Sequence, residues 1–148
     1  MINGLSRVSV AVKDIEDALV FYRDGLGLAV SAEMELPDRG LRLVRLRAAA
    51  GAEIELIQPT DPSGALATFI ERRGEGLHHI ALCVEDIELE MRALMARGVE
   101  MIDREAREGP GGRVAFVHPR ATGGVLVELY EASSTVESGG QKGEERSQ

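Results

Sequence analysis

The chain has 148 residues, a formal net charge of -8 and a pI of about 4.9. An acidic protein repels phosphate backbones, so this charge argues against nucleic-acid binding, while a local basic pocket for a small anionic ligand stays compatible with it. The length suits one domain with a sizeable hydrophobic core.

Cysteine usage and hydropathy predict a cytoplasmic protein. The single cysteine, Cys83, has no partner for an internal disulfide, which fits a reducing compartment. The stretch Met1–Ile15 lacks a charged segment followed by a long apolar run, so we expect no signal peptide. The apolar runs are far shorter than a membrane span, so no interaction with a membrane is predicted.

The first half of the chain predicts a strand, a helix and three more strands. The stretch Leu5–Val12 alternates apolar residues with small or polar ones, as a half-buried strand does. Asp14 is a suitable N-cap for a helix that runs roughly from Ile15 to Asp24 and stops at Gly25. The three further strands are predicted over Leu28–Glu35, Leu41–Arg47 and Ala52–Pro59.

A helix predicted over Ala65–Gly74 links this half to a second one. The stretch GLHHIALCVEDI predicts a strand, followed by a helix over Ile87–Arg97 that ends at Gly98. Three strands are then predicted over Val99–Asp103, Arg113–His118 and Val125–Ala132. Residues 133–148 are polar and rich in Gly, Ser and Glu, so a disordered tail is predicted there.

The two halves repeat each other. LSRVSVAVKDIEDAL aligns with LHHIALCVEDIELEM at an offset of 72 residues, and AEIELIQP aligns with VLVELYEA at an offset of 73. A repeat of this length is too long for a solenoid unit and fits a duplicated βαβββ module. We therefore predict an α+β fold in which modules at about 5–59 and 77–131 form curved mixed sheets around one site, within a single domain over residues 1–132.

The alternation along the two long strands predicts which side chains pack and which line the site. The larger apolar residues Val8, Val10 and Val12 are expected to pack under a helix. In the second module His78 lies on the equivalent packing face, where a hydrogen-bonded structural histidine is expected. His79 lies on the opposite face, with the smaller residues.

Four polar residues are predicted to converge between the modules. The repeat relates Arg7 to His79 and Glu55 to Glu128, and all four leave the apolar faces of their strands. Imidazole and carboxylate together suit a divalent metal. A lone Glu on a strand is usually a solvated outward residue, but two equivalent positions that both carry Glu favour a functional role.

Several stretches resemble the methylmalonyl-CoA epimerases of the vicinal oxygen chelate superfamily. GLHHIA and FVHPRATGGVLVEL are the specific ones, VAVKDIEDALVFYRDGLGL is shared more loosely, and the likeness covers residues 5–131. The resemblance implies an isomerase that interconverts the C2 stereoisomers of methylmalonyl-CoA, or of a similar 2-substituted malonyl-CoA, by proton abstraction and return. It also implies a homodimer.

The resemblance further implies a divalent metal (cobalt, manganese, zinc or nickel) held at positions 7, 55, 79 and 128. Glu55, His79 and Glu128 match as ligands, with Glu128 also a candidate base, but Arg7 stands where the family has His. A guanidinium offers no lone pair and cannot ligate a metal. Some epimerases of this kind place a catalytic Glu in the third strand, where this chain has Leu43.

Arg7 leaves three hypotheses open. In the first, three ligands and water hold a metal while Arg7 swings aside. In the second, Arg7 takes the metal position as a catalytic cation, pairs with Glu55 and Glu128, and stabilises an enolate or binds a substrate carboxylate. In the third, the chain is a non-catalytic small-ligand-binding protein or a glyoxalase-type lyase. A cation beside a divalent metal costs roughly 4 kcal/mol per pair of unit charges at 4 Å and an effective dielectric of 20, which argues against a metal next to an inward Arg7.

Overall fold

The computed structural model describes residues 1–134, so the predicted tail lies outside the described residues apart from Ser133 and Ser134. The strands are β1 (Ile2–Ala11), β2 (Ala29–Leu36), β3 (Leu41–Arg47), β4 (Glu53–Pro59), β5 (Gly76–Val84), β6 (Arg107–Gly109), β7 (Gly112–Val117) and β8 (Val127–Ala132). The α-helices are α1 (Ile15–Leu19), α2 (Ala65–Arg73) and α3 (Ile87–Ala96). None of the described helices is long and apolar enough to cross a bilayer.

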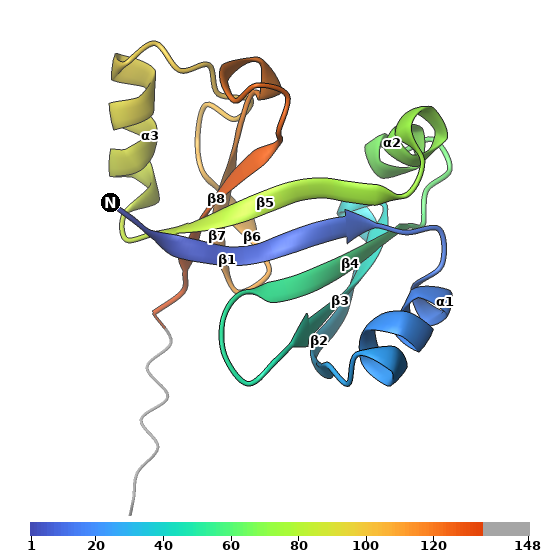
Figure 1. The fold of residues 1–148 in the computed structure, drawn as a ribbon. Coiled ribbons are helices and arrows are strands. Elements are labelled where there is room, and N and C mark those ends of the chain that lie inside the picture. The colour runs from blue at the N-terminus through green and yellow to red at the C-terminus, as the bar shows by residue number, and fades with distance from the viewer. Residues whose placement is uncertain (135–148) are drawn as a thin grey trace, which may run out of the picture.

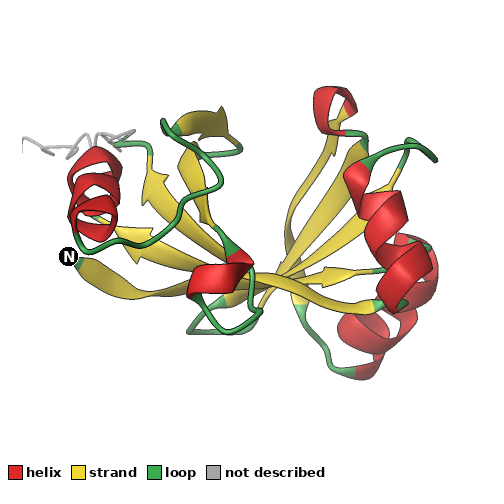
Figure 2. Cartoon of the chain, turned by 90° about the horizontal axis from the view of Figure 1, so that it is seen from above, coloured by secondary structure: helices red, strands yellow, loops and turns green. Residues whose placement is uncertain are grey.

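The predicted duplication is present as two modules that share one sheet. The strand order is β2-β3-β4-β1-β5-β8-β7-β6, in which β1 runs antiparallel to β5 and parallel to β4, and β5 runs parallel to β8. Figures 1 and 2 show β1 and β5 side by side through the middle, with the remaining strands of each module opening to either side. The curved sheet therefore brings its four central strands, two from each module, around one concave region.

The two modules use equivalent devices to start their helices. The carboxylates of Asp14 and Asp86 accept hydrogen bonds from the first turns of α1 and α3, as N-cap residues do. The first backbone N–H of each helix is bound by a side chain from the last strand of the same module, Gln58 Oε1 at 2.8 Å for α1 and Glu131 Oε2 at 2.7 Å for α3. After α1 the chain continues as a π-helical turn over Val20–Gly25. These bonds fix each helix to its own sheet.

The hydrophobic core lies in three clusters, one for each α-helix. The first joins α1 to β3 and β4, with Ile15, Leu46 and Leu56 fully buried. The second joins α3 to β7 and β8 around Ile87 and Leu129. The third consists of Ala11, Leu43, Ile57, Leu66 and Ile70 and packs α2 against the end of the concave region. The first two clusters thus fix α1 and α3 to the sheet of their own module, and the third places α2 at one end of the concave side.

The predicted packing faces of β1 are only partly right. Val12 is buried in the α1 cluster, but Val8 and Val10 are only half-buried, whereas Arg7 and Ser9 on the other face are buried. The polar and small face is the more buried one because the sheet curls around it and α2 covers its end. Val10 and Val12 thus pack in the α1 cluster as predicted, but the deeper burial of the opposite face was not anticipated.

The prediction of a strand over Val99–Asp103 was wrong. Only Met101 makes a bridge there, to Val117, and the second strand of the second module is instead the short β6. The carboxylate of Asp103 accepts a hydrogen bond from the backbone N–H of Phe116 at 2.8 Å. The N–H of Phe116 therefore bonds to a side chain and not to a backbone carbonyl, so the backbone hydrogen bonds between Val99–Asp103 and β7 do not extend into a strand pair.

We expect Gly112→Ala to destabilise the protein by about 2–3 kcal/mol, because a Cβ there would collide with the backbone carbonyl oxygen of Glu131 on β8. Gly25→Ala is the matched control, since its Cβ would make only an ordinary contact with the carbonyl oxygen of Val20, at 3.4 Å. Urea unfolding of both variants measures the difference. Equal stability of the two variants would refute the close approach of β7 and β8.

Candidate active site

The structure brings the four predicted polar residues together on the four central strands. Arg7 lies on β1, Glu55 on β4, His79 on β5 and Glu128 on β8. The strand register aligns Ser9 with both Glu55 and His79, and it aligns Ala81 with Glu128. All four side chains are more than nine-tenths buried. The duplicated sheet therefore places two acids, a guanidinium and an imidazole in one buried cluster.

Arg7 lies between the two carboxylates. Its Nη2 donates a hydrogen bond to Glu128 Oε1, and its Nε lies 3.4 Å from Glu55 Oε2. The ring of Tyr130 lies against the guanidinium, with its centroid 4.6 Å from the guanidinium carbon. Opposite charges and an aromatic face hold the buried cation in place.

Glu55 is a fully paired anion. Its Oε1 accepts from Ser9 Oγ at 2.8 Å, and its Oε2 accepts from Arg45 Nε at 2.8 Å. Burial disfavours the charged form, but the attraction of Arg7 and the bonds from Arg45 and Ser9 outweigh it, so the pKa of Glu55 lies below its usual value. Glu55 therefore stays ionised and serves to fix the two arginines.

Glu128 has a less polar setting than its counterpart. Its register neighbours on the adjacent strands are Ala81 and Phe116. One oxygen is bound by Arg7, and the other lies 3.3 Å from His79 Nε2 without the alignment of a hydrogen bond. Glu128 thus keeps one oxygen without a hydrogen-bond donor at a cavity wall, as a proton acceptor needs.

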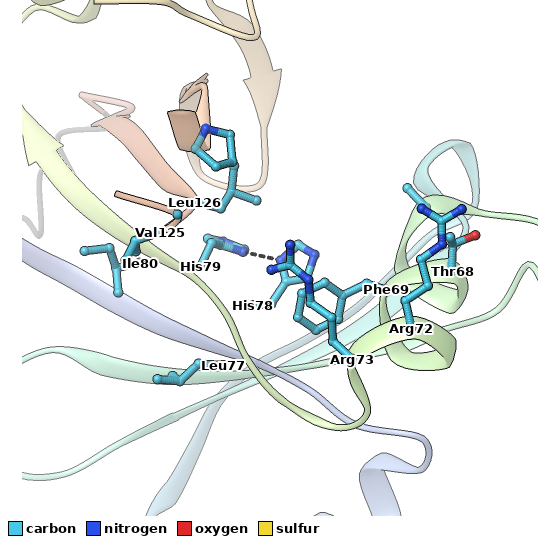
Figure 3. A pocket seen from close by; sticks show the side chains of 13 residues that line it. Thr68, Phe69, Arg72, Arg73, Leu77, His78, His79, Ile80, Val125 and Leu126 are labelled. Carbon is cyan, nitrogen blue, oxygen red and sulfur yellow. Dashed lines mark hydrogen bonds between the residues drawn. The ribbon is translucent and has the colours of Figure 1, made fainter. Parts of the chain in front are cut away.

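The two histidines contact each other, contrary to the prediction that His78 would turn away into the packing face. Ser9 pairs with His79 and Val10 pairs with Leu77, so His78 is an extra residue in β5, a β-bulge. The bulge turns the His78 ring toward His79, with their Nδ1 atoms 2.8 Å apart (Figure 3). One of these atoms must carry the proton, so the pair fixes opposite protonation at the two Nδ1 atoms.

A small cavity of about 160 Å³ adjoins the buried cluster. Four arginines line it (Arg7, Arg39, Arg45 and Arg107) against only two carboxylates. This cavity is locally positive although the whole chain carries a net charge of -8. An anionic ligand is therefore favoured. The contribution of Arg39 was missed because nothing in its local sequence distinguishes it from other surface arginines.

A larger cavity of about 440 Å³ lies on the other side of the histidine pair. Figure 3 shows Phe69, Arg72 and Arg73 of α2 on one side of it and Val125 and Leu126 on the other. It contains two cations and no carboxylate, so it too favours an anion. Both histidines line both cavities, which makes the two spaces neighbours.

The donor set does not fit a divalent metal in this geometry. Arg7 fills the space between Glu55 and Glu128, and the two oxygens of Glu55 already accept from Ser9 and Arg45. Across residues 1–134 no three His, Cys, Asp or Glu side chains are grouped so as to hold a metal ion. Leu43, at the third-strand position, is buried and lines the smaller cavity without offering a base.

Comparison with known proteins agrees with the fold. Residues 6–116 match the Glyoxalase/Bleomycin resistance protein/Dioxygenase superfamily. The chain is 37% identical over 130 residues to YqjC, an uncharacterized protein of Bacillus subtilis, covering 87% of this chain and 92% of that one. It is 36% identical to an ethylmalonyl-CoA/methylmalonyl-CoA epimerase of Cereibacter sphaeroides, covering 88% of this chain and 99% of the relative.

Solved structures of similar proteins share the fold throughout. A methylmalonyl-CoA epimerase from Mycobacterium tuberculosis superposes with a TM-score of 0.85 and 36% identity, covering 89% of each chain. A methylmalonyl-CoA epimerase in complex with methylmalonyl-CoA and NH4+ superposes with a TM-score of 0.86 and 26% identity, covering 90% of this chain and 97% of that one.

We expect Glu55→Ala to cost about 3–5 kcal/mol of stability, because it leaves Arg7 and Arg45 buried with one carboxylate between them. The control is Glu33→Ala, which breaks an exposed ion pair with Arg42 and should cost about 1 kcal/mol or less. Chemical denaturation measures both. A loss at Glu55 no larger than that at Glu33 would contradict the buried network.

The histidine pair predicts a loss of stability in mild acid. Burial, and next the neighbouring His79, lower the pKa of His78 from 6.5 to about 4. His78 therefore binds a proton more readily in the unfolded chain than in the folded one. Its contribution to the free energy of unfolding is complete above pH 6.5 and is lost as the pH falls toward 4. In denaturation from pH 7 to 4, His78→Gln should lose less stability than the parent protein, whereas His118→Gln should lose as much. An unchanged profile for His78→Gln would refute the assignment.

Proposed function

This chain belongs to the Glyoxalase/Bleomycin resistance protein/Dioxygenase superfamily, and on that premise we propose that it is an epimerase of methylmalonyl-CoA or a similar 2-substituted malonyl-CoA. Relatives and structural neighbours that carry this activity in their names support the substrate class. The observation that carries the proposal is Glu128, a buried carboxylate beside Arg7 at the wall of a positively charged cavity.

The charges of the two cavities suit such a substrate. A 2-substituted malonyl thioester carries a free carboxylate and a carbonyl oxygen that becomes negative when C2 loses its proton. The smaller cavity offers arginines for both groups. The larger cavity, with Arg72 and Arg73 and an apolar wall, suits part of a coenzyme A arm with its phosphates.

The site residues divide the reaction between a base and a cation. Glu128 takes the C2 proton: the C–H bond breaks, an O–H bond forms on the carboxyl group, and the electron pair moves onto the thioester oxygen. Arg7 Nε–H, which is buried and has no hydrogen-bond partner, donates to that developing oxyanion. A water molecule gives a proton to the opposite face of C2, and Glu128 then releases its own proton to solvent, which yields the other stereoisomer and restores the carboxylate.

A non-catalytic ligand-binding protein of the same superfamily is the second candidate. It is favoured by Leu43, which lines the smaller cavity where some epimerases have an acid, and by the pairing of Glu128 with Arg7. Such a protein would use the same positive cavity to bind an acyl-CoA without removing its proton. Binding and proton exchange therefore have to be measured separately.

We expect the protein to incorporate deuterium at C2 of methylmalonyl-CoA in D2O, measured by mass spectrometry against the spontaneous rate. Glu128→Gln should slow the enzymatic exchange by about 100-fold or more, because it removes the base and leaves a similar shape. The control is Glu100→Gln, an exposed residue paired with Arg120, which should keep the parent rate. Absence of exchange with and without added cobalt would refute the epimerase, and tight binding without exchange would favour the second candidate.

A further inference from the structure

We infer that Arg7 and Arg45 together replace the divalent ion, so that this is a site that works without a metal. The inference about metal binding stands on the geometry of the buried cluster alone. Only the catalytic use of Arg7 rests on the proposed function.

The position of Arg7 is the first reason. Its guanidinium contacts Glu128 through Nη2 and lies 3.4 Å from Glu55 through Nε, so it spans the two carboxylates that would hold a metal. The face of Tyr130 limits its movement. A metal could enter only if Arg7 left a pocket that is built around it.

The charge balance is the second reason. Arg7 and Arg45 bring two positive charges to Glu55 and Glu128, which is the charge that a divalent ion would bring, so the buried set sums to zero. A divalent ion added to this set would leave two uncompensated positive charges out of water, which is strongly unfavourable. Both arginines are thus needed to replace the divalent ion, because Arg7 alone supplies only one of its two positive charges.

The hydrogen-bonding capacity that remains is the third reason. Both oxygens of Glu55 accept from Ser9 and Arg45, so this carboxylate has donors where a metal would have to bind. Besides the second oxygen of Glu128, the groups left free beside the smaller cavity are Arg7 Nε and His79 Nε2, which are buried without a hydrogen-bond partner. Arg7 Nε–H is a donor that no metal could use, and it suits an oxyanion.

The test is metal content, which does not depend on activity. The parent protein and Arg7→His are each incubated with CoCl2, dialysed into metal-free buffer and measured by inductively coupled plasma mass spectrometry and calorimetry. The parent protein should retain far less than one equivalent, and chelator should leave its C2 exchange unchanged. Arg7→His should retain close to one equivalent and bind Co2+ tighter by about two orders of magnitude or more, since it frees Glu128 and adds an imidazole.

The control is Arg42→His, which places a new histidine near the exposed Glu16 and Glu33 and should retain no cobalt. Stoichiometric cobalt in the parent protein would overturn the inference, and so would a folded Arg7→His variant that binds no more than the parent. If Arg7→His does not fold, the parent measurement decides alone. Absence of C2 exchange in every sample would refute the proposed function, but it would not change the conclusion about metal binding.

Discussion

The site depends on one constraint, that charges taken out of water must neutralise each other. Arg7 and Arg45 face Glu55 and Glu128 in a region that is nine-tenths or more buried. Each partner makes the burial of the others tolerable, because an unpaired buried charge is far more costly than a paired one. The same balance leaves no room for an additional divalent cation, so the chemistry of the site follows from how its charges are paired.

Duplication supplied two equivalent acids, and their neighbours give them different properties. Glu55 is flanked in the sheet by Ser9 and Arg45, which saturate it with donors. Glu128 is flanked by Ala81 and Phe116, which give it none. One acid is therefore a fixed counter-ion, while the other retains an oxygen able to accept a proton. The different neighbours on the adjacent strands are thus enough to give Glu55 and Glu128 different roles, although the repeat makes the two positions equivalent.

Much of this arrangement could be predicted from the sequence, because the repeat aligned Glu55 with Glu128 and Arg7 with His79. The position of His78 could not, since a bulge in β5 depends on the register with β1, which no local pattern encodes. The role of Arg45 was also hidden, because an arginine on a strand looks the same whether it is solvated or paired across the sheet. A homodimer and a cytoplasmic location stay predictions, since the structure of one chain tests neither.

The guanidinium of Arg7 occupies the place of a metal between Glu55 and Glu128. A crystal structure of the protein grown with CoCl2, with data collected at the cobalt absorption edge, tests this placement directly. We expect continuous density for the Arg7 side chain between the two carboxylates and no anomalous peak there. An anomalous peak bound by Glu55, His79 and Glu128, with Arg7 turned away, would contradict it.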